Sequence, residues 1–212
     1  MVRSLAPEEF DSMQTLGDIA RNHARVRADR VAMQFEGRTT TFADLDRQSN
    51  QAAHALIAAG VRKGDRVAYL GKNSDRYFEI WFAAAKVGAI MTPIGWRLSP
   101  AEVAYILDDT DASILFVGGE CVANAMQALQ QSQATPHLIA IEAGDHGWPV
   151  YEAWRDAHAA SDPAIAVAPA DTTLLLYTSG TTGRPKGVML ANANLMRSRR
   201  ALAEAAMGWN EW

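Results

Sequence analysis

Short apolar runs alternate with helical segments through most of this 212-residue chain, and this alternation most restricts the folds that it can adopt. The run at 66–70 is almost continuously apolar, as is typical of a strand buried on both faces of a sheet. Such strands, separated by helices, predict an α/β fold with three α/β/α layers and a mainly parallel sheet. The expected strands are 31–35, 38–41, 66–70, 89–94, 113–117, 137–141, 174–177 and 187–190, and the expected helices are 16–27, 42–59, 75–87, 100–108, 120–132 and 192–206.

The ends of several expected helices carry specific signals. Ser99 is followed by a proline at the first helical position and by Glu102 at the third, which makes a full capping box. Thr41 is followed by an aspartate in the same relation. Gly60 and Gly88 stand where two helices should end, because glycine adopts the left-handed conformation freely.

Residues 142–171 interrupt the alternation, since they contain two glycines and the prolines Pro149, Pro163 and Pro169. We expect one short helix near 151–157 and otherwise a surface excursion. The sheet is then expected to resume at Thr172.

The segment after strand 174–177 reads Thr178-Ser179-Gly180-Thr181-Thr182-Gly183-Arg184-Pro185-Lys186-Gly187. Its glycines let backbone N–H groups approach an anion, its hydroxyl groups add donors, and its lysine adds a positive charge. The spacing is not that of a Walker A loop, and the apolar residues after the lysine indicate a loop between two strands. We interpret it as a polyphosphate-binding loop; the alternative is a polar surface hairpin without a ligand.

The loop resembles the phosphate-binding signature of the adenylate-forming (AMP-binding) superfamily, which includes acyl-CoA synthetases, luciferases and the adenylation domains of peptide synthetases. Residues 40–45, Thr-Thr-Phe-Ala-Asp-Leu, and 84–94, Ala-Ala-Lys-Val-Gly-Ala-Ile-Met-Thr-Pro-Ile, are similar to its first two core motifs. Residues 95–102, Gly-Trp-Arg-Leu-Ser-Pro-Ala-Glu, resemble a stretch that is common in fatty-acyl-CoA synthetases. The resemblance covers residues 15–205.

The resemblance implies an acid–thiol ligase that works in two steps. A carboxylic acid, expected to be a fatty acid, attacks the α-phosphate of magnesium-bound ATP, giving an acyl-adenylate and pyrophosphate, and coenzyme A then displaces AMP. No catalytic residue is assigned, Thr178 is expected to face Mg²⁺, and Arg184 and Pro185 are expected to shape the loop. The nucleotide-binding residues that the resemblance implies are Thr178, Ser179, Gly180, Thr181, Thr182, Gly183, Lys186 and Gly187.

Members of this superfamily are more than twice as long as this chain, so the resemblance implies an N-terminal part. Residues 1–171 would form an N-terminal α/β subdomain of the AMP-binding domain, and 172–212 the phosphate-loop hairpin, the next helix and the start of a truncated remainder. The family's adenine pocket and catalytic lysine would lie in the missing C-terminal part, so the isolated chain is expected to be inactive. Two alternatives remain: an adenylation domain that loads a carrier protein, against which the 95–102 stretch argues, and a non-catalytic fragment that binds nucleotide or protein.

Composition narrows the remaining classes of function. A net charge of −4 gives no general attraction to nucleic acid. The single cysteine, Cys121, excludes an internal disulfide and fits a cytoplasmic protein. No apolar run reaches the length of a transmembrane segment, so any membrane contact would be peripheral.

Several other residues favour structural roles. The five histidines are scattered, which argues against a zinc site. The acidic residues at 108–111 lie between a helix and a strand and indicate a solvated turn rather than a cation site. Phe78, Trp81 and Phe82 favour core packing over the lining of an acyl tunnel. Asn192 stands where many acyl-CoA synthetases have a histidine, which weakens any inference about the acyl chain.

Overall fold

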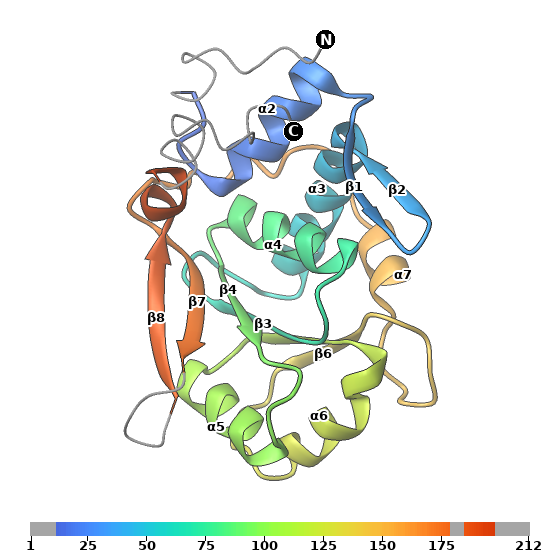
Figure 1. The fold of residues 1–212 in the computed structure, drawn as a ribbon, viewed down its shortest axis with the longest axis vertical. Coiled ribbons are helices and arrows are strands. Elements are labelled where there is room, and N and C mark those ends of the chain that lie inside the picture. Colours follow the sequence, from blue (N-terminus) through green and yellow to red (C-terminus); the bar gives the residue numbers. More distant parts are fainter. Residues whose placement is uncertain (1–11, 179–184, 198–212) are drawn as a thin grey trace.

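A six-stranded sheet forms the centre of the computed structural model, which describes residues 12–178 and 185–197 (Figure 1). The strand order is β6-β5-β3-β4-β7-β8; all neighbouring pairs are parallel except β7 and β8, which are antiparallel. The predicted α/β class with a mainly parallel sheet is therefore confirmed. The strands are β3 (Arg66–Leu70), β4 (Ile90–Ile94), β5 (Ile114–Val117), β6 (His137–Ala140), β7 (Thr172–Thr178) and β8 (Lys186–Ala191).

Two buried clusters lie on opposite faces of this sheet. Val67 belongs to one cluster and the next residue, Ala68, to the other, because successive strand residues point to opposite faces. Leu56 of α3 and Ile80 of α4 join the first cluster, and Ile106 of α5 joins the second, together with residues of α6. Helix α2 packs against α3 and α4, away from the sheet (Figure 1). The helices are α2 (Leu16–Arg27), α3 (Phe42–Ala58), α4 (Asp75–Val87), α5 (Pro100–Thr110) and α6 (Val122–Leu129).

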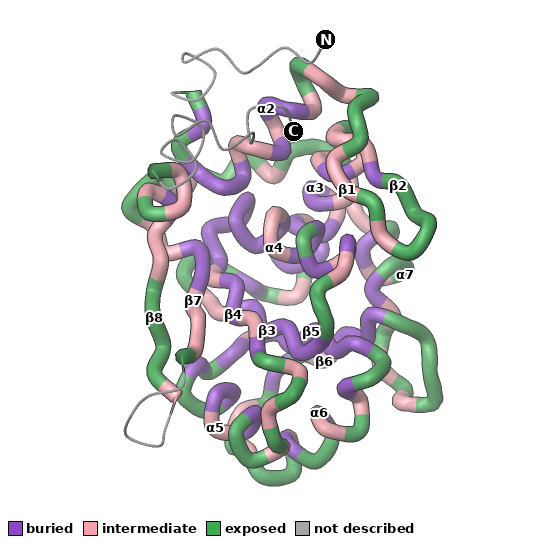
Figure 2. Tube along the Cα trace, viewed as in Figure 1, coloured by how far each residue is buried: buried purple, intermediate pink, exposed green. Residues whose placement is uncertain are grey.

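The sheet is exposed along one edge. Figure 2 shows that the central strands are mainly buried, whereas β8 is exposed over much of its length. Met189 of β8 is 69% exposed, although it is a large apolar residue. The hairpin β7–β8 therefore presents its outer strand to solvent in the described part of the chain.

The predicted hairpin and helix ends are confirmed. Strands β1 (Val31–Phe35) and β2 (Arg38–Thr41) pair across two residues with positive φ, Glu36 at 47° and Gly37 at 79°, as a tight two-residue turn requires. The capping boxes at Thr41 and Ser99 are both formed. Gly88 ends α4 in the left-handed conformation, with φ of 73°.

Helix α6 is shorter than the expected 120–132. The 3₁₀ turn η1 (Gly119–Cys121) precedes it, and the helix ends at Leu129. The Ser132 hydroxyl donates to the Asp108 carboxylate at 2.5 Å, and the backbone N–H of Gln133 donates to the same oxygen at 2.8 Å. These bonds to α5 draw the chain out of the helix, and the spacing of apolar residues did not reveal them.

The excursion at 142–171 is only partly on the surface, which corrects the sequence interpretation. Its short helix, α7 (Tyr151–Asp156), places a fully buried tyrosine, Tyr151, in the core. The Tyr151 hydroxyl and the Arg155 guanidinium donate to the buried carboxylate of Glu79 on α4, at 3.1 and 2.5 Å. The excursion therefore supplies two of the partners of the buried Glu79 charge, and Arg76 of α4 supplies a third.

Phe78, Trp81 and Phe82 do not form the fully buried face of α4, and Phe82 is half-buried. That face consists of Tyr77, Ile80, Ala83, Ala84 and Val87, which are all buried. Phe78 is 36% exposed, so the core interpretation was wrong for this residue, whereas Trp81 packs partly buried against the core.

A buried lysine joins the helices on the same side of the sheet. Lys86 of α4 is completely buried, and its Nζ lies 2.6 Å from Asp46 Oδ1, 2.8 Å from Ser49 Oγ and 2.7 Å from Asn50 Oδ1, all on α3. Burial lowers the pKa of Lys86, and the charge of Asp46 opposes that effect.

Candidate phosphate-binding hairpin

The antiparallel pair β7–β8 carries the predicted phosphate loop. Thr178, the last residue of β7, pairs with Lys186, the first residue of β8, and the Thr178 hydroxyl donates to the Lys186 carbonyl at 3.4 Å. Both residues are exposed. The structure thus brings a hydroxyl group and a lysine side by side at the two ends of the loop. The predicted site residues Ser179, Gly180, Thr181, Thr182 and Gly183 lie outside the described residues.

The hairpin starts at the carboxyl end of a parallel strand. Strand β7 pairs with β4 through Met91 and Leu174, in the parallel sense. Open α/β sheets bind their ligands outside the carboxyl ends of the parallel strands. The direction of β7 therefore puts Thr178 on the side of the sheet where ligand-binding loops are expected.

Helix α5 touches both ends of the loop. The hydroxyl of Tyr177, next to Thr178, donates to Asp109 Oδ2 at 2.5 Å. The hydroxyl of Tyr105 donates to the carbonyl of Pro185, next to Lys186, at 3.4 Å. Burial and the neighbouring Asp109 carboxylate raise the pKa of Tyr177, so its hydroxyl remains a donor throughout the physiological range. These contacts were not predicted, because the pairing of α5 with the hairpin is not visible in the sequence.

Gly187 faces Tyr177 across the hairpin. The two residues are direct partners in the β7–β8 ladder. A Cβ atom at Gly187 would lie 2.9 Å from Cδ1 of Leu175 and 3.4 Å from Cζ of Tyr177. The absence of a side chain at Gly187 therefore makes room for the Leu175 side chain and lets the Tyr177 ring pack closely, a role that the sequence did not indicate.

A second group of cations follows strands β3 and β4. The Nζ of Lys72 and the guanidinium carbon of Arg97 lie 5.0 and 4.0 Å from the ring centroid of Trp96. After these two neighbouring strands the chain enters helices on opposite faces, α4 and α5, which is the arrangement of a ligand-binding crevice. The sequence singled out Trp96 and Arg97 only as part of a family-like stretch, and Lys72 was missed.

The acidic residues at 108–111 are engaged in structural contacts. Asp108 accepts hydrogen bonds from the 132–134 turn, Asp109 accepts one from Tyr177, and the side chain of Asp111 is 92% exposed. Within the described residues, no group of three or more acidic, histidine or cysteine side chains is arranged to hold a metal ion.

Asn192 holds the end of the hairpin in place. It is 1% exposed, its Oδ1 accepts from the backbone N–H of Leu16 at 2.9 Å, and its Nδ2 donates to the Asp171 carbonyl at 3.2 Å. Residues 192–197 form the start of the expected helix, and 198–206 lie outside the described residues. The position that differs from the family pattern thus joins α2, the excursion and β8.

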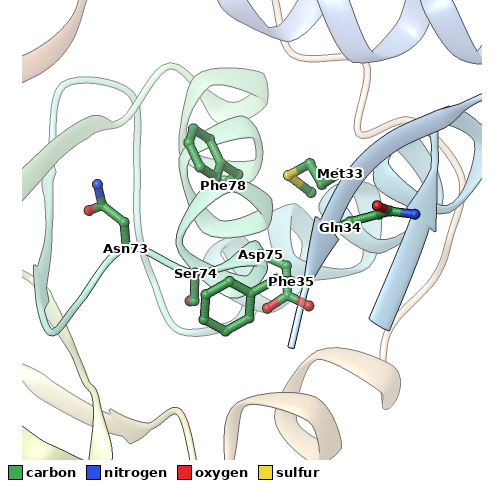
Figure 3. A pocket seen from close by; sticks show the side chains of 7 residues that line it. All are labelled: Met33, Gln34, Phe35, Asn73, Ser74, Asp75 and Phe78. Atoms are coloured by element: carbon green, nitrogen blue, oxygen red, sulfur yellow. The ribbon is translucent and has the colours of Figure 1, made fainter. Parts of the chain in front are cut away.

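Two pockets lie away from the β7–β8 hairpin. A pocket of about 320 Å³ opens between β1 and the start of α4, where Met33, Phe35 and Phe78 contribute its apolar lining (Figure 3). A hollow of about 330 Å³ lies between α6 and the turn after β6.

Cys121 is buried, and burial raises its pKa to about 11, which makes it unsuitable as a nucleophile. Across the two described stretches, no helix has both the length and the apolar character needed to cross a bilayer.

Comparison with known proteins gives consistent matches over nearly the whole chain. A sequence model of the family "AMP-binding enzyme" matches residues 20–211. The fatty acid–[acyl-carrier-protein] ligase ScoC of Streptomyces coeruleorubidus is 40% identical over 201 residues, which are 94% of this chain and 37% of that protein. A feruloyl-CoA synthase of an Amycolatopsis species is 39% identical over 182 residues, 86% of this chain and 34% of that protein.

Solved structures show the same fold. The anthranilate CoA ligase AuaEII, in complex with anthranoyl-AMP, superposes with a TM-score of 0.81 at 29% identity, over 90% of this chain and 36% of that chain. The chain spans about a third of the length of the relatives that it matches.

Proposed function

Because this chain belongs to the AMP-binding enzyme family, we propose that it is the N-terminal part of an ATP-dependent ligase that activates a carboxylic acid as its acyl-adenylate. The observation that carries this proposal is the pairing of Thr178 with Lys186 at the two ends of the loop. A residue with a hydroxyl group and a lysine are paired there, on either side of a segment rich in glycine, serine and threonine.

In the proposed first step, the acid carboxylate attacks the α-phosphorus of ATP, and the bond from that phosphorus to the bridging oxygen of pyrophosphate breaks. The products are an acyl-adenylate and pyrophosphate, and the leaving group takes the negative charge. The proposed task of Lys186 is to neutralise charge on the β- and γ-phosphates while the loop holds them in line. Ser179, Gly180, Thr181, Thr182, Gly183 and Gly187 are proposed to complete this phosphate site.

The hydroxyl oxygen of Thr178 fits as a ligand of a magnesium ion that is bound mainly through phosphate oxygens. Mg²⁺ prefers oxygen ligands and commonly takes only one or two from the protein, and Thr178 offers an exposed hydroxyl oxygen at the end of the loop. Thr178 would therefore hold the ion together with ATP. When bound, the ion would neutralise phosphate charge.

In the proposed second step, a thiol attacks the acyl carbon and AMP departs. We favour coenzyme A as the thiol, since the family-like stretch at 95–102 follows the crevice strand β4 and carries the exposed guanidinium of Arg97, which suits a phosphate-bearing substrate. The second candidate is a carrier protein, because the 40% identical relative is a fatty acid–[acyl-carrier-protein] ligase. A fatty or other hydrophobic acid is the proposed first substrate.

We place the enzyme in the cytoplasm, because its single cysteine is suited to a reducing compartment, with only peripheral contact to membranes. Residues 1–171 would act as one subdomain, and residues 172–212 would lead into a remainder that completes the nucleotide site. The 212-residue chain by itself is accordingly expected not to complete either step.

ATP–pyrophosphate exchange with a panel of fatty and aromatic acids tests the first step. We expect exchange from the longest gene product that contains this chain, and a loss of at least about 100-fold on Lys186→Ala, the scale of removing one charge-stabilising group from an active site. Lys63→Ala, which removes an exposed lysine elsewhere on the chain, serves as the control. Exchange that survives Lys186→Ala would contradict the proposed phosphate site. Assays of acyl transfer to coenzyme A and to a carrier protein then show which of the two thiols is the acceptor.

A further inference from the structure

Helix α5 contacts the residues that flank the predicted phosphate loop on both sides. We infer that Tyr177, Asp109 and Tyr105 are positioning residues, which hold Thr178 and Lys186 in register on α5 so that their groups converge on one phosphate ligand. This inference rests on the proposed function, because it assigns a role in phosphate binding at the same hairpin. None of the three side chains is proposed to touch the ligand.

The first contact fixes the β7 end of the loop. The Tyr177 hydroxyl lies 2.5 Å from Asp109 Oδ2, and the donor is next in sequence to Thr178. A hydrogen bond to a charged acceptor is shorter and stronger than one between neutral groups. The bond therefore ties the last residues of β7 to the carboxyl-terminal turn of α5.

The second contact fixes the β8 end. Tyr105 is one turn before Asp109 on α5, so both side chains project from the same side of the helix. Its hydroxyl donates to the Pro185 carbonyl at 3.4 Å, and Pro185 precedes Lys186. One face of one helix thus contacts the chain on both sides of the loop.

The ladder itself couples the two ends. Tyr177 and Gly187 are paired residues, and a Cβ atom at Gly187 would lie 3.4 Å from Cζ of the tyrosine ring, so the ring packs against the backbone of β8. The helix that receives these contacts is well anchored, since a capping box begins it and Ile106 and Leu107 are fully buried on its inner face. A stiff support of this kind reduces the conformational freedom that the loop would lose on binding an anion.

The test measures, by titration calorimetry, the affinity for magnesium pyrophosphate of the longest gene product that contains this chain. We expect Tyr177→Phe and Asp109→Ala each to weaken binding about 3- to 10-fold, as for the loss of one hydrogen bond. The double variant should be no weaker than either single one, because both remove the same bond. Tyr105→Phe should weaken binding by a smaller factor, in keeping with its longer bond.

Two aspartate variants distinguish positioning from charge. Asp109→Asn keeps an acceptor for Tyr177 and should restore the unmodified affinity or exceed it, since one negative charge is lost. Asp111→Asn removes the charge of an exposed side chain two residues further along the chain. This variant should also bind pyrophosphate as well as the unmodified protein, or more tightly. If Asp109→Ala acted only by destabilising α5, it would lower the melting temperature, and Asp109→Asn would not restore the affinity.

The outcomes separate this inference from the proposed function. If Lys186→Ala abolishes binding but Tyr177→Phe and Asp109→Ala leave it unchanged, the phosphate site stands and the positioning role is overturned. If the unmodified protein does not bind pyrophosphate, or Lys186→Ala binds it equally well, the proposed phosphate site is contradicted and the positioning role falls with it.

Discussion

A lysine without access to solvent, Lys86, connects α4 to α3. Lys86 satisfies its three donors with a carboxylate, a hydroxyl and an amide oxygen of α3. A buried charge is costly unless every such contact is made, so removing either partner is far more damaging than losing a surface ion pair. The packing of α3 against α4 therefore depends on this polar contact as well as on apolar burial.

We predict that Lys86→Met destabilises the chain by roughly 3 kcal/mol, because it leaves the Asp46 carboxylate and the Asn50 amide without their donor. Lys86→Ala should cost more, since it also leaves a cavity. Urea unfolding measures both values. Lys63→Met, which removes a partly exposed pair with Asp171, is the control and should cost under about 1 kcal/mol. Equal effects at Lys63 and Lys86 would contradict the account of Lys86.

At this residue scale, the sequence was informative about the loop and silent about its support. Glycine, hydroxyl and lysine chemistry pointed to the segment after Tyr177, and the structure brings Thr178 and Lys186 together at its ends. Asp109, by contrast, was interpreted as part of a solvated turn, because its partner is 68 residues away in the chain. A contact between residues that distant leaves no local pattern in a single sequence.

At the scale of elements, helix ends were predicted better than the packing between helices. Caps and glycine terminators act within a few residues, so Ser99, Thr41 and Gly88 could be identified from local sequence. Helix α6 ended early because its last expected turn bonds to Asp108 on another helix. The core role of α7 was missed for the same kind of reason, since its partner, Glu79, belongs to α4.

The hydroxyl of Ser99 caps the N-terminus of α5. Ser99→Ala removes the hydroxyl that accepts the Glu102 N–H, so we expect a loss of about 1 kcal/mol in urea unfolding. Ser99→Asp can accept the same hydrogen bond and should retain most of the stability. A Ser99→Ala chain that unfolds at the unchanged urea concentration would show that the capping box contributes nothing to α5.

For the molecule as a whole, strand order was the largest unknown. The alternation of elements predicted a parallel sheet but not the order β6-β5-β3-β4-β7-β8, in which β4 connects to β5 across β3. Nor did it indicate that Asn192 would join α2 to the end of β8. Both features depend on which surfaces fit together after the elements have formed.

The stability of the whole chain should decline in acid. Burial of the Asp75 carboxylate raises its pKa, but the hydrogen bond from Arg38 and the charges of Arg76 and Arg38 lower it by more. The pKa of Asp75 therefore lies below its usual 3.8. The pKa of Asp162 is lowered in the same way by Arg21. Because the unfolded chain binds these protons more tightly, their contribution is present above about pH 3.8 and is lost as the pH falls through the lowered values.

Urea unfolding between pH 7 and pH 2.5 measures this effect. Asp75→Asn should lower the free energy of unfolding at pH 7 and make it depend less on pH in the acid range. The reason is that the charge pair with Arg38 is then absent at both pH 7 and pH 2.5. Asp29→Asn, at an exposed position, is the control and should leave the profile unchanged. An Asp75→Asn profile parallel to that of the unmodified chain would rule out this carboxylate as a source of acid sensitivity.

The position of β7 beside β4 has a consequence for synthesis on the ribosome. Roughly 80 residues separate these neighbours, so at about 5–20 residues per second some 4–16 seconds pass before β7 emerges to pair with β4. During that interval β3, β4, β5 and β6 can assemble, but β4 remains an open edge with unpaired backbone groups. The nascent chain is therefore most prone to mispairing at β4, a strand that is covered on both sides once the sheet is complete.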